Sequence, residues 1–141
     1  MDVLQLLKAE FRERKSELSA LEKPETSDAA KKKILGALNA HLAWESEYLL
    51  PELSHIASRG DVLFDKYQQS LSELNTMSRK KGQDDLDLLK AFNSHTFIVE
   101  EKILPYMRQK IPTIDREELY HVFADAKQEL IATRSASFAS H

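Results

Sequence analysis

Apolar residues recur every three or four positions along most of this chain, and this spacing constrains the fold more than any other feature. Such a repeat places apolar side chains on one face of a helix with 3.6 residues per turn, whereas a half-buried strand alternates every second residue. The stripe in residues 2–22 consists of Leu4, Leu7, Phe11, Leu18 and Leu21. Pro24 follows it, so we predict an amphipathic helix that ends before this proline.

Three more segments carry the same pattern and are separated by residues that end helices. They span residues 29–57, 61–80 and 84–111. Gly60 and Gly82 mark the breaks between these segments, because glycine readily adopts the backbone conformation that ends a helix. Pro112 ends the last one, since the residue before a proline is disfavoured in the helical region.

The C-terminal part predicts one further helix. Asp115 and Glu118 have the spacing of a capping box, and we expect a shorter fifth helix to about residue 133, followed by a frayed tail at residues 134–141. Short connections between long amphipathic helices favour antiparallel neighbours. The expected fold is therefore all-α, an antiparallel up-down-up-down four-helix bundle formed by residues 1–133, with the short fifth helix on an end or flank.

Composition limits the classes of function. The 141 residues are 42% apolar and 30% charged, which suits one globular domain. The net charge of −3 comes from interspersed charges, so no basic face suited to nucleic acid is expected. The chain has no cysteine and starts with an amphipathic segment, which together favour a cytoplasmic protein with no membrane partner. The sequence is compatible with a homodimer.

Two histidines stand at equal distances from two prolines. His41 precedes Pro51 by ten residues, and His95 precedes Pro105 by ten residues. Both prolines lie late in a predicted helix, where each should remove one backbone hydrogen bond and bend the helix. This repeat indicates that the two segments contribute to one functional site.

Carboxylates accompany both histidines. Glu45 follows His41 by four residues on the apolar stripe, so both side chains are expected to point into the bundle. Glu100 follows His95 by five residues and reaches the same centre only if the helix is distorted, for example by a π-bulge. Buried histidine and glutamate are costly unless they pair, accept hydrogen bonds or bind a metal. An ion pair within the helix is the alternative to a metal site.

These segments resemble a known family. Residues 41–51, HLAWESEYLLP, resemble the H-x-x-x-E…(Y/F)-P segment of hemerythrin-like (HHE cation-binding) domains, and residues 95–105 resemble its second copy. Residues 6–11, LLKAEF, are similar to the L-L-x-x-D-H start of that family. The resemblance covers about residues 4–130.

The resemblance implies a metal centre. Members of this family hold two non-haem irons through histidines from all four helices and bridging carboxylates, and they bind or sense dioxygen or handle nitric oxide, peroxide or iron. By resemblance, the metal ligands of this chain would be His41, Glu45, His95 and Glu100. One or two iron ions, with dioxygen, nitric oxide or another small ligand, would then be the expected cofactor and partner.

The chain also departs from the family. The histidine positions of the first and third helices fall on Phe11 and Phe64, which cannot ligate a metal. Glu10, Tyr67 or Gln68 would have to act as substitute ligands.

Two hypotheses follow. One is a metal-binding or sensing module with a reduced ligand set, and the other is a metal-free bundle that acts as an interaction or regulatory protein, with phenylalanines filling the ligand positions. We expect no enzyme activity, because the sequence shows no nucleophile–base constellation and no phosphate-binding glycine loop. His55 and His121 are expected at the surface, and Trp44 at a helix interface.

Overall fold

The computed structural model describes residues 1–139, with side chains described as far as residue 132. Within that part of the chain all regular structure is helical, which confirms the all-α prediction. The α-helices are α1 (Val3–Leu18), α2 (Asp28–Trp44), α3 (Leu50–Ile56), α4 (Val62–Arg79), α5 (Asp85–Ile98), α6 (Leu104–Lys110) and α7 (Thr113–Ala139). A 3-10 turn (Ser19–Glu22) extends α1. Two π-helical segments (Glu45–Leu49 and Val99–Ile103) join α2 to α3 and α5 to α6.

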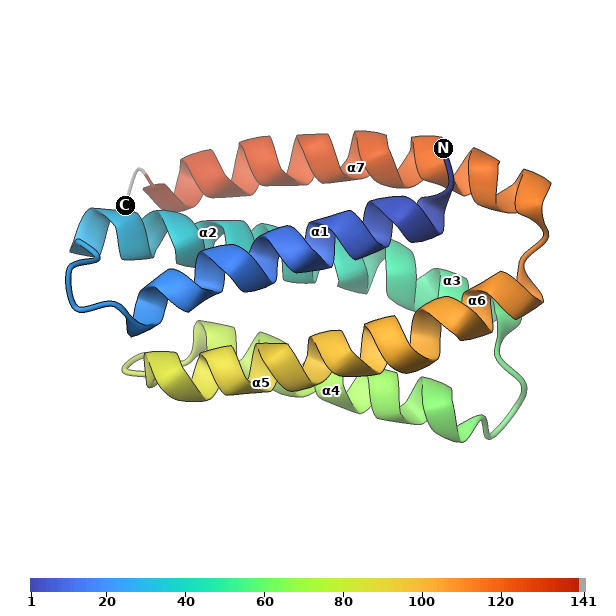
Figure 1. Cartoon of the computed structure of the whole chain (residues 1–141), viewed down its shortest axis with the longest axis horizontal. Helices are drawn as coiled ribbons and strands as arrows, with labels where there is room; N and C mark the ends of the chain where they lie inside the picture. Colours follow the sequence, from blue (N-terminus) through green and yellow to red (C-terminus); the bar gives the residue numbers. More distant parts are fainter. Residues whose placement is uncertain (140–141) are drawn as a thin grey trace.

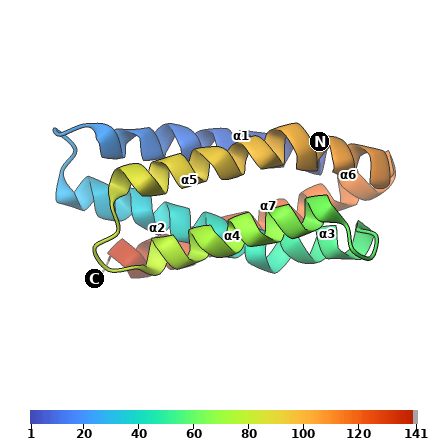
Figure 2. The same ribbon diagram turned by 90° about the horizontal axis from the view of Figure 1, so that it is seen from below.

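The helices form long rods that lie side by side. α2 and α3 make one continuous rod, as do α5 and α6, and consecutive rods run back and forth along one long axis (Figures 1 and 2). The longest helix, α7, packs chiefly on α2 and α1 and lies along them (Figure 1). None of the helices in residues 1–139 combines the length and the apolar character that crossing a membrane requires.

Side-chain caps fix where the rods begin. Asp2 and Gln5 form a reciprocal capping box at the start of α1, which satisfies two backbone N–H groups that have no partner inside the helix. Ser27, Asp61 and Asp84 accept hydrogen bonds from the first turns of α2, α4 and α5. These starts agree with the predicted boundaries to within one or two residues.

Both late prolines lie two residues after the end of a π-helical segment. Pro51 is near the start of α3 and Pro105 is near the start of α6. In each case the backbone N–H of the residue before the proline donates to the carbonyl five residues earlier, that of Glu45 or of Val99. Proline cannot donate a hydrogen bond, so the backbone widens by one residue there and the rod continues.

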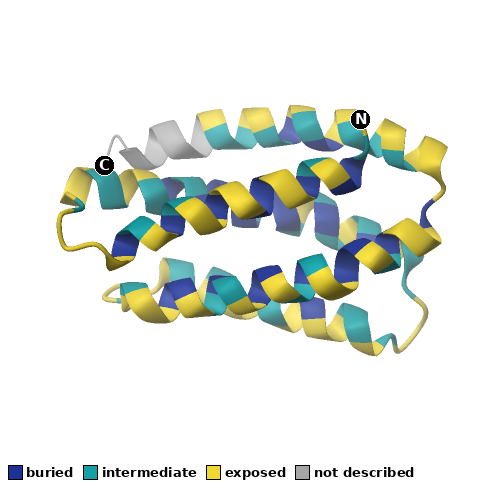
Figure 3. Cartoon of the chain, in the orientation of Figure 1, coloured by how far each residue is buried: buried dark blue, intermediate teal, exposed yellow. Residues whose placement is uncertain are grey.

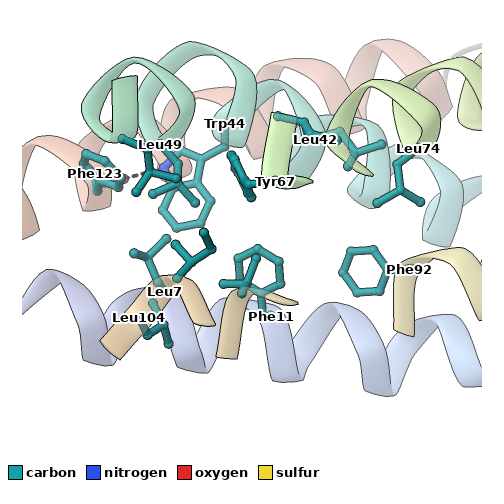
Figure 4. Close-up of a cluster of buried hydrophobic side chains, with 14 of the residues drawn as sticks. Leu7, Phe11, Leu42, Trp44, Leu49, Tyr67, Leu74, Phe92, Leu104 and Phe123 are labelled. Carbon is teal, nitrogen blue, oxygen red and sulfur yellow. Dashed lines mark hydrogen bonds between the residues drawn. The ribbon is translucent and has the colours of Figure 1, made fainter. Parts of the chain in front are cut away.

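Large side chains fill the space between the rods, and the buried residues lie on their facing sides (Figure 3). The largest fully buried aromatic residues are Phe11, Trp44, Tyr67, Phe92 and Phe123. The indole Nε1 of Trp44 donates to the backbone oxygen of Phe123 at 2.9 Å, a bond between α2 and α7 that is drawn in Figure 4. This contact confirms that Trp44 lies at a helix interface.

The C-terminal helix is longer than predicted. α7 has 27 residues, Thr113–Ala139, and begins with a hydrogen bond from the Arg116 N–H to the oxygen of Pro112. The predicted fifth helix is therefore present but not short, because packing along α2 and α1 stabilises a long helix whose apolar stripe is weak in sequence. Residues 134–139, expected in a frayed tail, belong to this helix, while residues 140–141, including His141, lie outside the described residues.

Candidate functional site

Three of the four predicted metal ligands meet inside the bundle. His41 lies in the last turn of α2, Glu45 starts the first π-helical segment, and His95 lies in the last turn of α5; all three are at most 1% exposed. The Nε2 atom of His41 is 2.7 Å from Oε2 of Glu45, and Nε2 of His95 is 2.7 Å from Oε1. One carboxylate therefore bridges two imidazole rings.

The bridge continues in both directions. Nδ1 of His41 forms a short hydrogen bond with Oε2 of Glu10 on α1, and Nδ1 of His95 is 2.8 Å from the hydroxyl of Ser70 on α4. We call the series Ser70, His95, Glu45, His41 and Glu10 the buried polar chain. It joins all four rods formed by α1, by α2 with α3, by α4 and by α5 with α6, so side chains from four parts of the sequence share one hydrogen-bonded path.

Cations close one end of the buried polar chain. Arg14, one turn after Glu10 on α1, donates from Nε to Oε2 of that carboxylate at 3.1 Å. Lys127 of α7 places its Nζ 3.3 Å from Oε1 of Glu10. Arg14 is itself buried and also pairs with Glu17. The negative charge of Glu10 is thus matched by cations from two helices.

A tyrosine supports the central carboxylate. The hydroxyl of Tyr67 on α4 donates to Oε1 of Glu45 at 2.8 Å. Burial and the negative charge of Glu45 raise the pKa of Tyr67 well above its usual value, so the hydroxyl keeps its proton. Tyr67 therefore acts as a permanent donor to Glu45.

The neighbours decide the charge of each group. Burial opposes ionisation of Glu45, but the charges and hydrogen bonds of His95 and His41 outweigh it and lower its pKa to about 2. Burial likewise opposes protonation of His41, but Glu45 and Glu10 outweigh it and raise the pKa of this histidine to about 9. For Glu10, burial is outweighed by the hydrogen bond and charge of His41, and the pKa falls below its usual value.

Aromatic rings enclose the histidines. The centroid of the Phe11 ring is 4.6 Å from the centroid of the His41 ring, with an angle of 89° between the two ring planes. It is 5.9 Å from the centroid of the His95 ring. Phe92 packs on His41 at 5.5 Å, and Figure 4 shows Phe11, Phe92 and Tyr67 in one buried cluster. Phe11 occupies the position where the family resemblance places a histidine ligand. Its ring excludes water and so strengthens the electrostatic interactions of the buried polar chain.

Glu100 does not join the site. The second π-helical segment lies where a distortion was predicted, but the Glu100 side chain is 25% exposed and 3.8 Å from Nε of Arg12 at the surface. Val99, four residues after His95, takes the inward position and is fully buried. The widened turn changes the backbone bonding without turning residue 100 inward.

Two of the three proposed substitute ligands lie in the site, and the third does not. Glu10 and Tyr67 belong to the site, whereas Gln68 is exposed on α4. Phe64 is half-buried against the core, and Tyr67, one turn later, is the residue of α4 that contacts Glu45. His55 and His121 are exposed, as expected.

The donors do not converge on one point. Within the described part of the chain, no three histidine, aspartate, glutamate or cysteine side chains are placed so that they could hold a metal ion. The two Nε2 atoms face different oxygens of Glu45, and both oxygens already accept hydrogen bonds. In this arrangement the residues pair with one another and do not fit the four-ligand site that the sequence predicts.

Sequence reasoning missed three participants: Ser70, Arg14 and Lys127. The spacing of Arg14 four residues after Glu10 could have indicated an ion pair on α1. Ser70 and Lys127 reach the site only through contacts between distant helices, so no local pattern marks them. Comparison with known proteins assigns no family: no family model matches the chain, and neither does any curated protein or any solved structure.

Proposed function

We propose that this protein is a metal-independent bundle of hemerythrin-like form that acts as an interaction or regulatory protein. The up-down-up-down bundle would consist of α1, α2 with α3, α4, and α5 with α6, and α7 would be an addition along α1 and α2. The alternating directions of these rods and the repeated histidine, π-helical segment and proline support this form.

The observation that carries the proposal is the closed pairing of the buried polar chain. Both ring nitrogens of His41 and of His95 have partners, and both oxygens of Glu45 accept hydrogen bonds. A buried charge is tolerated when its partners neutralise it and satisfy its hydrogen-bonding atoms. These contacts meet that requirement for His41, Glu45 and His95 without an ion, and at Glu10 the Oε1 atom has no hydrogen bond but is 3.3 Å from the Nζ of Lys127.

The aromatic cluster supports the same view. Phe11 is fully buried and packs on both histidine rings, so aromatic carbon fills the place of one expected ligand. A metal site would need an open coordination position or a further donor at this point. Here the position is occupied by a side chain that cannot ligate a metal.

The outer surface offers contact area for a partner. Ile114 and Val122 on α7 are 67% and 51% exposed, and their spacing of eight residues places them on one face of the helix. Phe97 on α5 is 63% exposed. These large apolar side chains support the interaction part of the proposal.

Metal content and thermal unfolding test the proposal together. Purified protein, supplied with ferrous iron and then desalted, should contain far less than one ion per chain by elemental analysis. Its melting temperature should be the same with iron and with a chelator, because a ligand stabilises only a state that binds it. One or two ions per chain, lost in the His41→Ala and His95→Ala variants, would overturn the proposal.

The second candidate is the metal-binding or sensing module. It is favoured by one observation, that His41, Glu45, His95, Glu10 and Tyr67 are gathered in one buried cluster. In this candidate non-haem iron would replace the protons between these side chains, and dioxygen or nitric oxide would be its ligand. Stoichiometric iron in the same experiment would establish it.

A further inference from the structure

A surface groove between α4 and α5 gives access to one end of the buried polar chain. Its volume is about 370 Å³, and Ser70 is part of its lining. The same Ser70 hydroxyl is 2.8 Å from Nδ1 of His95, which is itself fully buried. Of the five residues in the buried polar chain, Ser70 is the one that lines this groove. His95 follows Ser70 in that chain, and Glu45 follows His95.

Ser70 uses its hydroxyl differently from Ser46 and Thr76. Ser46 and Thr76 donate to the backbone oxygen four residues earlier, at 2.8 Å and 3.1 Å, as serine and threonine commonly do inside helices. The hydroxyl of Ser70 instead contacts a ring nitrogen on a neighbouring helix. An imidazole beside a hydroxyl is the arrangement that activates serine as a nucleophile.

The hydrogen bonds also fix the tautomer of His95. Tyr67 donates to Glu45, and the neighbouring groups lower the pKa of Glu45 to about 2, so it is an ionised carboxylate without a proton to donate. The Nε2 atom of His95, 2.7 Å from Oε1 of Glu45, must therefore carry the proton. Its Nδ1 atom, 2.8 Å from the Ser70 hydroxyl, is therefore the ring nitrogen placed to take the proton of that hydroxyl.

We propose that Ser70, His95 and Glu45 form a nucleophile, base and carboxylate triad that accepts an acyl group from a small activated ester in the α4–α5 groove. The two ring nitrogens have exchanged roles relative to the usual serine hydrolases, in which Nε2 faces the serine. The inference rests on the metal-independent part of the proposed function, because a metal bound at His95 or Glu45 would break the triad.

The chemistry balances with water as the only co-reactant. The oxygen of Ser70 attacks the ester carbonyl carbon while its proton moves to Nδ1 of His95, and a tetrahedral oxyanion forms. The bond to the leaving alcohol then breaks, and that alcohol takes the proton from Nδ1. Water attacks the acyl-serine with Nδ1 as its base, which releases the carboxylic acid and returns the proton to Ser70.

The groove lining indicates the class of substrate. Lys66 and Glu73, one turn before and one turn after Ser70 on α4, bring one charge of each sign to the lining, and the positive charge of Lys66 can stabilise the oxyanion. Leu74, Ala91 and Ile98 provide apolar contact for a short acyl chain. A short-chain ester with a good leaving group therefore fits better than a peptide or a phosphate ester.

Acetylation by p-nitrophenyl acetate, with a chelator present throughout, tests the proposal on the full chain. We expect release of p-nitrophenolate and the mass of one acetyl group on Ser70 in peptide mass spectra. Ser70→Ala should abolish this label, and Ser70→Cys should retain a label at the same position. Ser94→Ala, in the same groove but outside the triad, is the matched control and should label like the unchanged protein.

His95→Gln should slow labelling of Ser70 at least about 100-fold, as expected for loss of a general base. If this variant does not fold, as judged by circular dichroism, the comparison of Ser70→Ala with Ser94→Ala still decides the matter. A label confined to Lys66, or release of p-nitrophenolate by the chelator-treated protein that is no faster than by Ser70→Ala together with no label on Ser70, would overturn the triad. That result would leave metal independence untouched, because metal content is measured separately.

Discussion

The segments His41–Pro51 and His95–Pro105 share one backbone design but differ in a single inward position. In each, a histidine lies in the last turn of an α-helix, a π-helical segment starts four residues later, and a proline follows that segment. The residue at the start of the π-helical segment is Glu45 in the first and Val99 in the second. One glutamate therefore serves both histidines, and the difference produces a linear chain of pairs instead of a symmetric metal cage.

The second segment keeps its carboxylates outside. Glu100 pairs with Arg12 at the surface, and both residues line a surface pocket together with Glu101. The second carboxylate of the core comes instead from Glu10 of α1. The second carboxylate, which the sequence predicted in the second segment at Glu100, thus comes from α1 as Glu10 and contacts His41. Position on a helix, more than the presence of a carboxylate nearby in sequence, decides which residue enters the site.

The largest expected effect comes from replacing the two residues that distinguish the segments. Glu45→Ala should lower the free energy of unfolding by about 4 kcal/mol, because it leaves two buried histidines and Tyr67 without their partner. Val99→Ala, which removes only apolar carbon, should cost about 2 kcal/mol. Urea denaturation of both variants measures the difference, and equal losses would show that Glu45 has no special structural role.

At alkaline pH, the free energy of unfolding should depend on the protonation of His41. Its pKa is raised from 6.5 to about 9, so the stabilisation is complete below pH 6.5 and is lost as the pH rises through 9. The loss should be roughly 3 kcal/mol, since one pKa unit corresponds to about 1.4 kcal/mol. Denaturation curves across this range should decline for the unchanged protein and stay nearly flat for His41→Gln. An equal decline in both would assign the effect to other groups.

At acidic pH, the free energy of unfolding should depend on the ionisation of Glu45. Its pKa is lowered from 4.5 to about 2, so the stabilisation is present above pH 4.5 and is lost as the pH falls through 2. Stability should therefore be greatest between about pH 4.5 and 6.5, where Glu45 is ionised and His41 is protonated.

Much of this site could be read from sequence. The four-residue spacing of His41 and Glu45 predicts that both face inward, and Glu10 and Tyr67 were foreseen as substitutes for missing ligands. Glu100 was misplaced because the predicted distortion of the helix is present but leaves Val99, and not Glu100, facing inward. Ser70 and Lys127 could not be foreseen, because they meet the site only across helix interfaces, and the length of α7 depends on packing that its own pattern barely indicates.

A smaller effect is expected for Tyr67→Phe. It removes one hydrogen bond to the Glu45 carboxylate but leaves both histidine contacts, and should cost about 2 kcal/mol. Tyr106→Phe is a suitable control, because its hydroxyl binds Asp61 in a half-exposed position. Thermal unfolding should shift clearly for the first variant and little for the second. The reverse order would contradict the central role of Glu45.

The smallest effect is expected for Glu100→Gln. A partly exposed ion pair contributes little, so the free energy of unfolding should change by less than about 0.5 kcal/mol. A loss of several kcal/mol would return Glu100 to the site and restore the symmetry of the two segments.

Nitrogen NMR of the imidazole side chains tests the pairing of His41, Glu45 and His95 most directly. At neutral pH, both nitrogens of His41 should carry protons, Nε2 of His95 should carry one, and adding Zn²⁺ should leave these signals unchanged. Loss of the Nε2 protons of both histidines on addition of one equivalent of Zn²⁺ would contradict the account, because these atoms would then be metal ligands.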